Sequence, residues 1–378
     1  MMNIETEKRK GQNPFELVQR EKQLADQKFE GQAIGFFKDA ILRFRKNKAS
    51  TVAAFFIGLI IMMAIIAPLI SSFTYREQNI EWTLLPPRVP GIEKLGIFDG
   101  TRTLDIQKAN LDGKYKDSVV KIIDEFEMDY RGRKIPMVKA KVDMYQMKEA
   151  KDQYFWMGTD SLGRDQWTRL WKGTRISLLI GFVAVTINVL IGITYGSICG
   201  YYGGRIDMIM QRIIEILNGV PQLVLVILFV MYLGAGIMPI ILAMVLTGWI
   251  GMSRMIRAQF YKYKGQEYVL ASRTMGAKDR ALIFRHILPN AIGPIITQAT
   301  LAVPGAIFTE AFLSYLGLGI AAPDPSIGVL LSDGQRLLLD HPYLTLFPAI
   351  VISILMLSFN LFGNGLRDAF DPTLRGQE

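Results

Sequence analysis

The stretch EYVLASRTMGAKDRALIFRHILPN, residues 267–290, is mostly polar and lies between two long apolar blocks. It predicts a short helix, a break at Gly276 and a second helix that bends at Pro289. Glycine readily takes the left-handed conformation that ends a helix, and proline interrupts helical hydrogen bonding. A flexible connection between apolar blocks needs no such order. We therefore expect the segment to contact a specific partner or surface.

The two flanking blocks belong to a set of five charge-free segments. Asp, Glu, Lys and Arg are absent from residues 50–75, 176–204, 216–253, 286–309 and 342–366. Roughly 20 apolar residues cross a membrane as a helix, which satisfies its own backbone hydrogen bonds. The block 216–253 is long enough for two spans and carries Gly234, Gly236 and Pro239 near its middle. The sequence therefore predicts an all-α polytopic membrane protein with six spans.

The charge distribution predicts the topology. Residues 254–285 carry eight Lys or Arg and two acids, whereas residues 316–341 carry one Arg and three Asp. Because basic loops stay cytoplasmic, we expect residues 254–285 and both termini inside a cell membrane. The net charge of +9 is thus assigned to topology and not to nucleic-acid binding. Four bases on the expected outer side run against the rule, which weakens across long loops: Arg164, Arg169, Lys172 and Arg175.

The other segments follow from composition. The expected order is a cytoplasmic leader (1–49) with a surface helix near 33–48, span 1 (50–75), an extracytoplasmic insert (76–157), an interfacial elbow helix (158–175), a transmembrane core (176–366) with loop 254–285, and a cytoplasmic tail (367–378). The first span is a retained anchor, because it is too long and too late for a cleaved signal. Within the insert, VVKIIDEFEMDY and KIPMVKAKVDMYQ partly alternate as half-buried strands do. A small α+β subdomain is therefore expected there.

The elbow combines a capping residue with an aromatic face. Asp165 is placed to cap the helix, and a binding role for Arg164 or Asp165 is the alternative. Trp167, Leu170 and Trp171 then fall on one face. Tryptophan at a span boundary favours the headgroup layer, so this face is expected at the membrane surface.

Motifs for chemistry are absent from the sequence. It contains no phosphate-binding P-loop, no H-E-x-x-H and no G-x-S-x-G. His286 and His341 are far apart, and the single cysteine, Cys199, lies in a span, so no catalytic residue, metal or cofactor is expected on this chain. Polar residues in the spans are scattered and form no charged relay. Those considered for a translocation path are Asn188, Gln298 and Glu310.

Glu310 has two interpretations. A carboxylate near the hydrocarbon boundary is costly unless it meets water, a donor or a base. It either snorkels or caps the turn beyond its span, or it faces the outer mouth of a path.

The helix of the opening stretch has one distinct face. Its members recur at helical spacing: Tyr268, Ala271, Ser272 and Met275. Glu267 lies off this face, and Asp279 is placed to cap the second helix. A helix this short is marginal alone, so it gains order either by burying this stripe in a protein partner or by lying on the lipid surface.

The same stretch resembles the cytoplasmic loop of binding-protein-dependent ABC importer permeases. Gly276 matches the family glycine and Leu288-Pro289 the terminal pair, while the Glu-Ala-Ala triplet is partly kept as Leu270-Ala271-Ser272. Glu267 lies one turn before the missing glutamate. GTDSLGRDQWTRLWKGTRISLLIG, TEAFLSYLGLG and GNGLRDAFDPTLR further resemble the oligopeptide/dipeptide branch, in its C-type subunit.

The resemblance implies the type I ABC importer permease fold and a set of partners. These are a second homologous permease subunit in a heterodimer, two cytoplasmic ATPases that bind ATP and Mg, and an external peptide-binding protein. The coupling loop to the ATPase would include Glu267, Tyr268, Ala271, Ser272, Met275, Gly276, Leu288 and Pro289. The alternatives are a permease of the same branch for nickel, heme or another small solute, and, in a different class, an ion-coupled carrier or membrane scaffold.

Overall fold

The computed structural model describes residues 35–111, 113, 115, 117–130 and 133–370. The chain divides into two compact units, Met1–Asp39 and Ala40–Glu378, and the features below belong to the second. The expectations for residues 1–34 and 371–378 lie outside the described residues.

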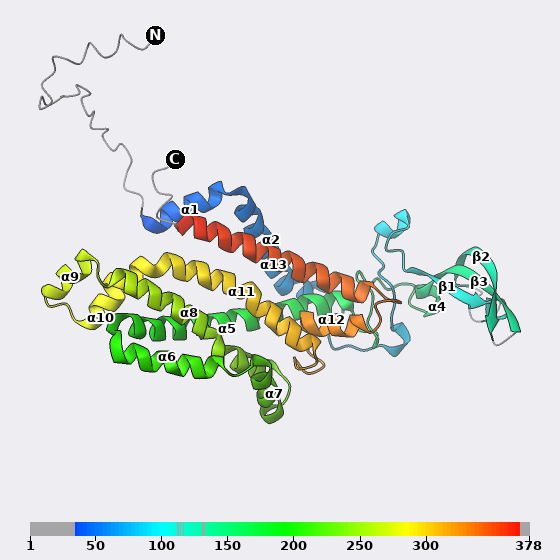
Figure 1. Cartoon of the computed structure of the whole chain (residues 1–378). Helices are drawn as coiled ribbons and strands as arrows, with labels where there is room; N and C mark the ends of the chain where they lie inside the picture. The colour runs from blue at the N-terminus through cyan, green and yellow to red at the C-terminus, as the bar shows by residue number, and fades with distance from the viewer. Residues whose placement is uncertain (1–34, 112, 114, 116, 131–132, 371–378) are drawn as a thin grey trace, which may run out of the picture. The chain divides into compact units, whose positions relative to one another are not determined.

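Helices dominate the described chain, with one small sheet (Figure 1). The long helices are α2 (Lys48–Ile70), α5 (Gln166–Tyr202), α6 (Gly204–Asn218), α7 (Gln222–Leu233), α8 (Ile237–Tyr263), α11 (Ile292–Tyr315) and α13 (Tyr343–Phe370). The shorter helices are α1 (Phe36–Lys46), α3 (Lys108–Leu111), α4 (Met144–Met147), α9 (Glu267–Thr274), α10 (Asp279–Ala281) and α12 (Ile327–Gln335). The strands are β1 (Thr101–Gln107), β2 (Val119–Tyr130) and β3 (Arg133–Asp143). Single turns of 3-10 helix are Ile80–Trp82 and Ile92–Leu95.

Five of the described helices are long and apolar enough to cross a membrane, and there are six if the bent pair α6–α7 is counted as one span. The split of block 216–253 falls between Leu233 and Ile237, as expected, but its first half is only the twelve-residue α7. α6 precedes α7, and the two helices meet at a bend of 73°. Pro221 lies at the break, where it has no N–H for a continuing helix.

The expected separate elbow is absent, because α5 runs without a break from Gln166 through Tyr202. Asp165 caps α5 as predicted, since its carboxylate accepts from the Thr168 N–H at 2.9 Å. The aromatic face is not at a surface, because Leu170 is fully buried and Trp171 is 8% exposed. Trp171 also meets Trp167 edge to face at 5.7 Å. This face therefore packs against the bundle and not against headgroups.

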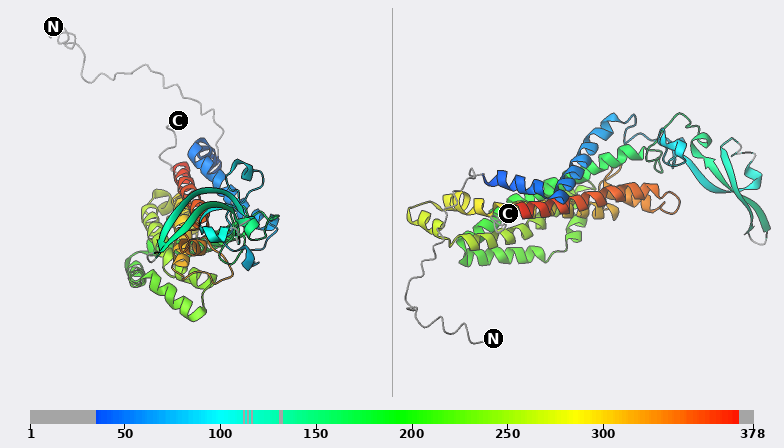
Figure 2. Two further views of the ribbon diagram at one scale, coloured as in Figure 1. Left: turned by 90° about the vertical axis from the view of Figure 1, so that its right-hand side faces the viewer. Right: turned by 90° about the horizontal axis from the view of Figure 1, so that it is seen from above.

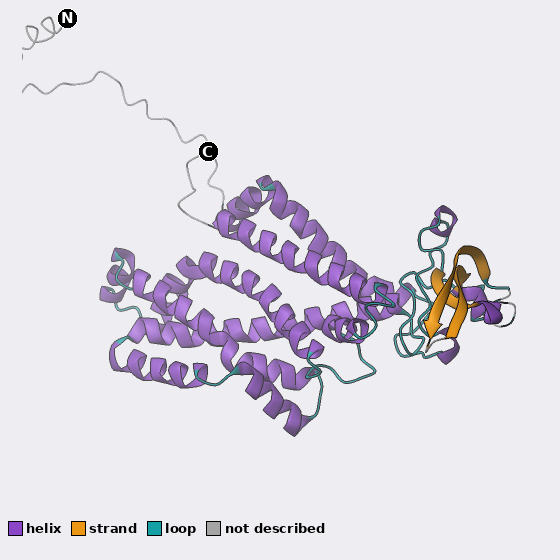
Figure 3. Ribbon diagram, turned by 45° about the vertical axis from the view of Figure 1, so that its right-hand side comes forward, coloured by secondary structure: helices purple, strands orange, loops and turns teal. Residues whose placement is uncertain are grey.

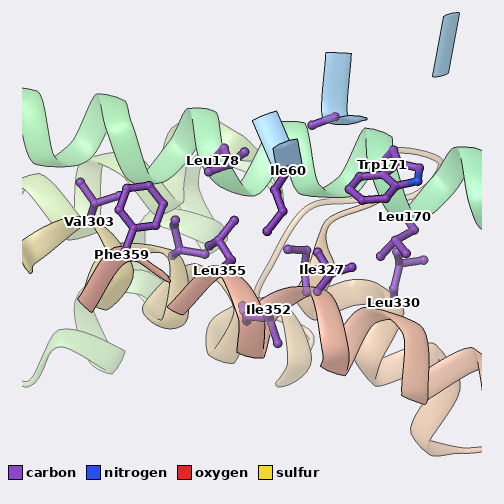
Figure 4. Packing of buried hydrophobic residues seen from close by; sticks show 14 of the residues in the cluster. Ile60, Leu170, Trp171, Leu178, Val303, Ile327, Leu330, Ile352, Leu355 and Phe359 are labelled. Carbon is purple, nitrogen blue, oxygen red and sulfur yellow. The ribbon is translucent and has the colours of Figure 1, made fainter. Parts of the chain in front are cut away.

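The long helices α5, α8, α11 and α13 run side by side (Figures 1 and 2). Figure 4 shows the largest apolar cluster among them, where α2, α5, α11, α12 and α13 meet. Its labelled members are Ile60, Leu170, Trp171, Leu178, Val303, Ile327, Leu330, Ile352, Leu355 and Phe359.

The closest helix pair is α5 with α8. Gly192, Gly196 and Gly200 recur every fourth residue along α5, and a Cβ atom on any of them would overlap atoms of α8. Small residues at this spacing let helices in a membrane approach until their backbones touch. The seam between α5 and α8 therefore depends on these three glycines.

The insert folds as the sequence predicts, around an antiparallel sheet of order β1-β3-β2. β2 coincides with VVKIIDEFEMDY and β3 with most of KIPMVKAKVDMYQ. Figure 3 shows the strands gathered beyond one end of the helices, which we call the sheet end; α9 lies at the opposite end, the α9 end. Tyr145 and Phe155 belong to the apolar core of this small subdomain.

Two of the four bases on the expected outer side are paired with acids. Arg164 and Arg169 are both buried against Asp160, at N–O distances of 2.7 and 3.3 Å, and Arg169 also faces Asp333 at 3.6 Å. Lys172 lies 5.2 Å above the ring of Tyr75. Because Arg164 and Arg169 are paired with acids, they add little net positive charge to the outer side, which accounts for their place beside a span.

The insert contacts the helices through His341, in the turn before α13. Arg102 of β1 donates to His341 Nε2 at 2.8 Å and pairs with Asp340 at 3.1 Å. His341 is 6% exposed, and burial together with the Arg102 guanidinium lowers its pKa to about 4. The folded protein therefore keeps this imidazole neutral.

Lowering the pH from 6.5 to 4 should weaken the fold at this contact. The pKa of His341 is lower in the folded state, so the unfolded protein binds this proton more readily. The free energy of unfolding is therefore unaffected by His341 above about pH 6.5 and falls by on the order of 2 kcal/mol as the pH drops toward 4. His341→Asn keeps an acceptor for Arg102 but does not titrate. Thermal unfolding should therefore depend less on pH in His341→Asn than in the wild type. His286→Asn, at the only other histidine, is the control, and equal pH profiles for all three proteins would contradict the assignment.

Candidate functional site

Helix α9 rests on the bundle by one residue and exposes most of the rest. Val269 is its only buried residue and packs with Tyr201 and Phe260, at the ends of α5 and α8. On the other side Tyr268 is 41% exposed and Met275 80%. The predicted stripe therefore points away from the chain's own core.

The remaining stripe and loop residues agree in part with expectation. Ala271 and Glu267 are exposed, whereas Ser272 is half-buried and donates to the Tyr268 carbonyl at 2.8 Å. Gly276 has φ of +84°, as a helix-ending glycine should. Leu270, 45% exposed, adds an apolar side chain that the predicted stripe did not include.

Asp279 does not cap the second helix, contrary to the prediction. Lys278 occupies the capping position, and Asp279 Oδ1 accepts instead from the Tyr201 hydroxyl at 2.6 Å. The guanidinium of Arg273 lies 5.6 Å from the same tyrosine ring. These contacts tie the loop to the end of α5.

The loop enters α11 through irregular helix. A π-helical turn at Leu282–Ile287 and a 3-10 turn at Leu288–Ala291 precede α11. Pro289 is exposed, and its missing N–H is consistent with the departure from α-helical geometry. Leu288 is half-buried against the apolar cluster under α9. The helix type changes at Leu288-Pro289, and α9 is joined to α11 by a packed connection.

A cavity of about 230 Å³ lies among α5, α7, α8 and α11. It brings together Asn188 and Gln298, two of the residues considered for a path, with Gln222 from the start of α7. Its other lining residues are Val185, Val189, Met244, Gly248, Gly251, Met252, Ala302, Ala306 and Thr309. The lining thus offers amide groups and small side chains but no charge.

Asn188 is held at the cavity wall by close packing. Its Nδ2 lies 3.5 Å from the Met244 carbonyl, and Gly248 leaves it room that any Cβ would fill. Its Oδ1 is buried and has no partner among the described residues. An unsatisfied buried acceptor favours a hydrogen-bond donor in the cavity.

The other cavities and residue clusters of the described chain do not bring the expected path residues together. A larger cavity of about 330 Å³ at the sheet end, lined by Ile66, Trp156 and Trp167 among others, contains none of the expected path residues. Within the described ranges no group of His, Cys, Asp or Glu is arranged to hold a metal ion.

Glu310 does not line the cavity, and because it is fully buried it neither snorkels beyond its span nor faces an outer mouth of this chain. It is fully buried and accepts from Ser177 of α5 at 2.5 Å and from Ser314 at 2.7 Å. Ser177 in turn accepts from the Ile327 N–H at 3.3 Å, at the start of α12. A negative group is favoured beside a helix N-terminus. Glu310 therefore joins α5, α11 and α12 inside the chain.

Comparison with known proteins decides the family. The model described as binding-protein-dependent transport system inner membrane component matches residues 192–376, and that for the N-terminal TM domain of oligopeptide transport permease C matches residues 35–87. The oligopeptide transport system permease protein OppC of Bacillus subtilis is 42% identical over 349 residues, which cover 92% of this chain and 93% of that protein. The chain belongs to the binding-protein-dependent permease family.

The chain is also similar to a second curated permease and to a solved structure. The dipeptide transport system permease protein DppC of Lactococcus lactis subsp. cremoris is 37% identical over 365 residues, 95% of this permease and 96% of that protein. Among solved structures, a chain of the MetNI methionine ABC transporter in inward-facing conformations is 18% identical with a TM-score of 0.45, covering 54% of this permease and 96% of that chain. Its membership of the inner membrane component family and its long apolar helices make the permease a multi-pass membrane protein of the type I ABC importer permease fold.

Substitution of Glu310 should affect the stability of the fold more than transport. Glu310→Gln keeps the shape and an acceptor for the two serines, so uptake and thermal stability should stay near the wild-type values. Glu310→Ala leaves buried hydroxyls unpaired and opens a cavity, which should cost about 2–4 kcal/mol. Thermal unfolding and uptake of both purified variants would test this. An intact Glu310→Gln protein that no longer supports uptake would return Glu310 to the transport path.

Proposed function

We propose that this permease is one subunit of an ATP-driven importer that carries oligopeptides or dipeptides across the cell membrane. Its relatives OppC and DppC, similar over nearly the whole chain, bear those substrates in their names. The observation that carries the substrate class is the uncharged cavity with Asn188, Gln222 and Gln298. Amide side chains both donate and accept, so they match the N–H and C=O groups of a peptide backbone. A lining without charge does not select among charged peptide side chains.

The α9 end faces the cytoplasm in this proposal, and α9 is the coupling helix. The stripe of Tyr268, Ala271 and Met275 seats in a groove of a cytoplasmic ATPase, one of two that bind ATP and Mg. Exposure of this stripe and the basic composition of residues 254–285 support the assignment. Movement of the loop reaches α11 through the packed turns at Leu282–Ile287 and Leu288–Ala291. Hydrolysis occurs on the ATPase, and this chain performs no catalysis.

The sheet end faces outward, where a peptide-binding protein delivers its cargo. A second homologous permease subunit supplies the other half of the path. The cavity lined by Asn188, Gln222 and Gln298 then forms one wall of a shared channel.

The transport assignment is tested with the complete complex in proteoliposomes. Uptake of a labelled tripeptide should require ATP and the loaded binding protein, and should continue after ion gradients are collapsed. Nickel and heme, offered under the same conditions, should not accumulate. Accumulation of nickel or heme without peptide uptake would overturn the substrate class, and uptake that stops with the ion gradient would overturn the importer assignment.

Charging the coupling stripe should uncouple transport. Ala271→Arg places an unpaired charge in a close protein interface, which typically costs several kcal/mol. Peptide uptake should fall at least tenfold and the ATPases should co-purify poorly, while the inserted subunit remains present. Gln266→Arg, at an exposed position before α9 begins, is the control and should retain both. Normal ATPase binding and uptake in Ala271→Arg would rule out this docking face.

A further inference from the structure

Helix α6 is attached to the bundle at very few points. Of its fifteen residues only Asp207 and Ile214 are buried. Ile214 packs with Trp249 and Ile250 of α8 near the middle of the helix. Asp207, in the first turn, is the only buried charged side chain of α6. Tyr195 of α5 also donates to the Met210 carbonyl at 2.7 Å, and Gly203 connects the α9 end of α6 directly to α5. Beside that connection, Asp207 is the one buried side chain in the first turn of α6.

Asp207 is held by two residues of α8 that lie one turn apart. Arg257 donates through Nε to Oδ1 at 2.6 Å and through Nη2 to Oδ2 at 2.5 Å, and the Tyr261 hydroxyl donates to Oδ2 at 2.9 Å. A two-pronged guanidinium–carboxylate pair fixes orientation as well as distance. We call Asp207, Arg257 and Tyr261 the α6 clamp.

The clamp lies next to the residues that hold the coupling loop. Lys264, one turn beyond Tyr261, lies 4.0 Å from that ring and donates to the Gly200 carbonyl at 2.9 Å. The next residue of α5, Tyr201, donates to Asp279 of the loop. The loop, the ends of α5 and α8, and the first turn of α6 therefore form one connected set of contacts.

At its other end α6 reaches the cavity. The break between Asn218 and Gln222 bends the chain by 73°, and Gln222 lines the cavity directly after it. Gly219 and Pro221 lie in this break. A change in the angle of α6 therefore moves the wall that carries Gln222.

We propose that the α6 clamp transmits movement of the coupling loop to the α6–α7 wall of the cavity, so that Asp207 and Arg257 are positioning residues for transport. The proposal rests on the proposed function, because it requires that the loop be moved by an ATPase. Loop movement carries the end of α8 with it, and the two-pronged pair forces α6 to follow. Without the clamp, the ATPases still move the loop, but the wall at Gln222 does not respond.

Conservative substitutions in the complete complex test the clamp. Arg257→Lys keeps the positive charge but loses the two-pronged geometry, and Asp207→Asn keeps the shape but loses the negative charge. Arg212 and Glu215 form an exposed ion pair on the same helix at 2.5 Å, so Arg212→Lys and Glu215→Gln are matched controls. Each variant is reconstituted with its partners, and peptide uptake and ATP hydrolysis are measured per assembled complex.

We expect Arg257→Lys and Asp207→Asn to lower uptake at least tenfold while ATP hydrolysis stays within about twofold of the wild type, which raises the ATP consumed per peptide at least fivefold. Both controls should keep the wild-type ratio. A purely structural role would lower uptake and hydrolysis together, with loss of assembled complex, and that result would overturn the proposal. Unchanged uptake in both clamp variants would overturn it as well.

A second measurement follows the movement itself. Spin labels on α6 at Ile213 and on α8 at Leu246, both exposed, should report a distance that is the same for both nucleotide states in the wild type, because α6 follows α8, but differs between them in Arg257→Lys. A distance that stays the same in Arg257→Lys as well would overturn the clamp while leaving the importer assignment intact. Failure of the wild-type complex to import any peptide would instead contradict the proposed function.

Discussion

The close packing of α5 on α8 is the constraint on which the rest of the bundle depends. At Gly192, Gly196 and Gly200, α5 has no side chain facing α8, so α8 packs directly against its backbone along several turns. Dispersion contacts and not water release hold helices together in lipid, which makes such contact effective. The seam fixes the ends of α5 and α8 as one platform. Val269 of α9 and the α6 clamp are both built on this platform.

At both ends of the bundle, buried charged groups are paired with groups of opposite sign. At the sheet end Asp160 pairs with Arg164 and Arg169, and near the α9 end Asp207 pairs with Arg257. An unpaired charge at these depths would cost several kcal/mol. Pairing leaves the cavity free of charge, so the groups that fold the protein are separate from the groups that face a solute.

The two functional surfaces differ in how they are supported. The cavity lies between long packed helices, and its amide groups are fixed by neighbours such as Gly248 beside Asn188. Helix α9 has a single buried residue, and its stripe is exposed. A surface must be exposed to bind another protein, whereas the wall of a path must be rigid to hold its polar groups in place. The packed turns before α11 and the α6 clamp connect the two.

Local sequence patterns determined the spans, two of the three strands, the break at Gly276 and the exposed stripe of α9. Each depends on residues close together in the chain, through apolar length, alternation or a left-handed glycine. Only the tertiary structure decided the rest. Gln222 joins Asn188 and Gln298 at one cavity because the chain bends by 73° between α6 and α7. Glu310 is buried with a partner because Ser177 of another helix donates to it. Such contacts join residues far apart in sequence, and packing between helices, which no local pattern encodes, sets them.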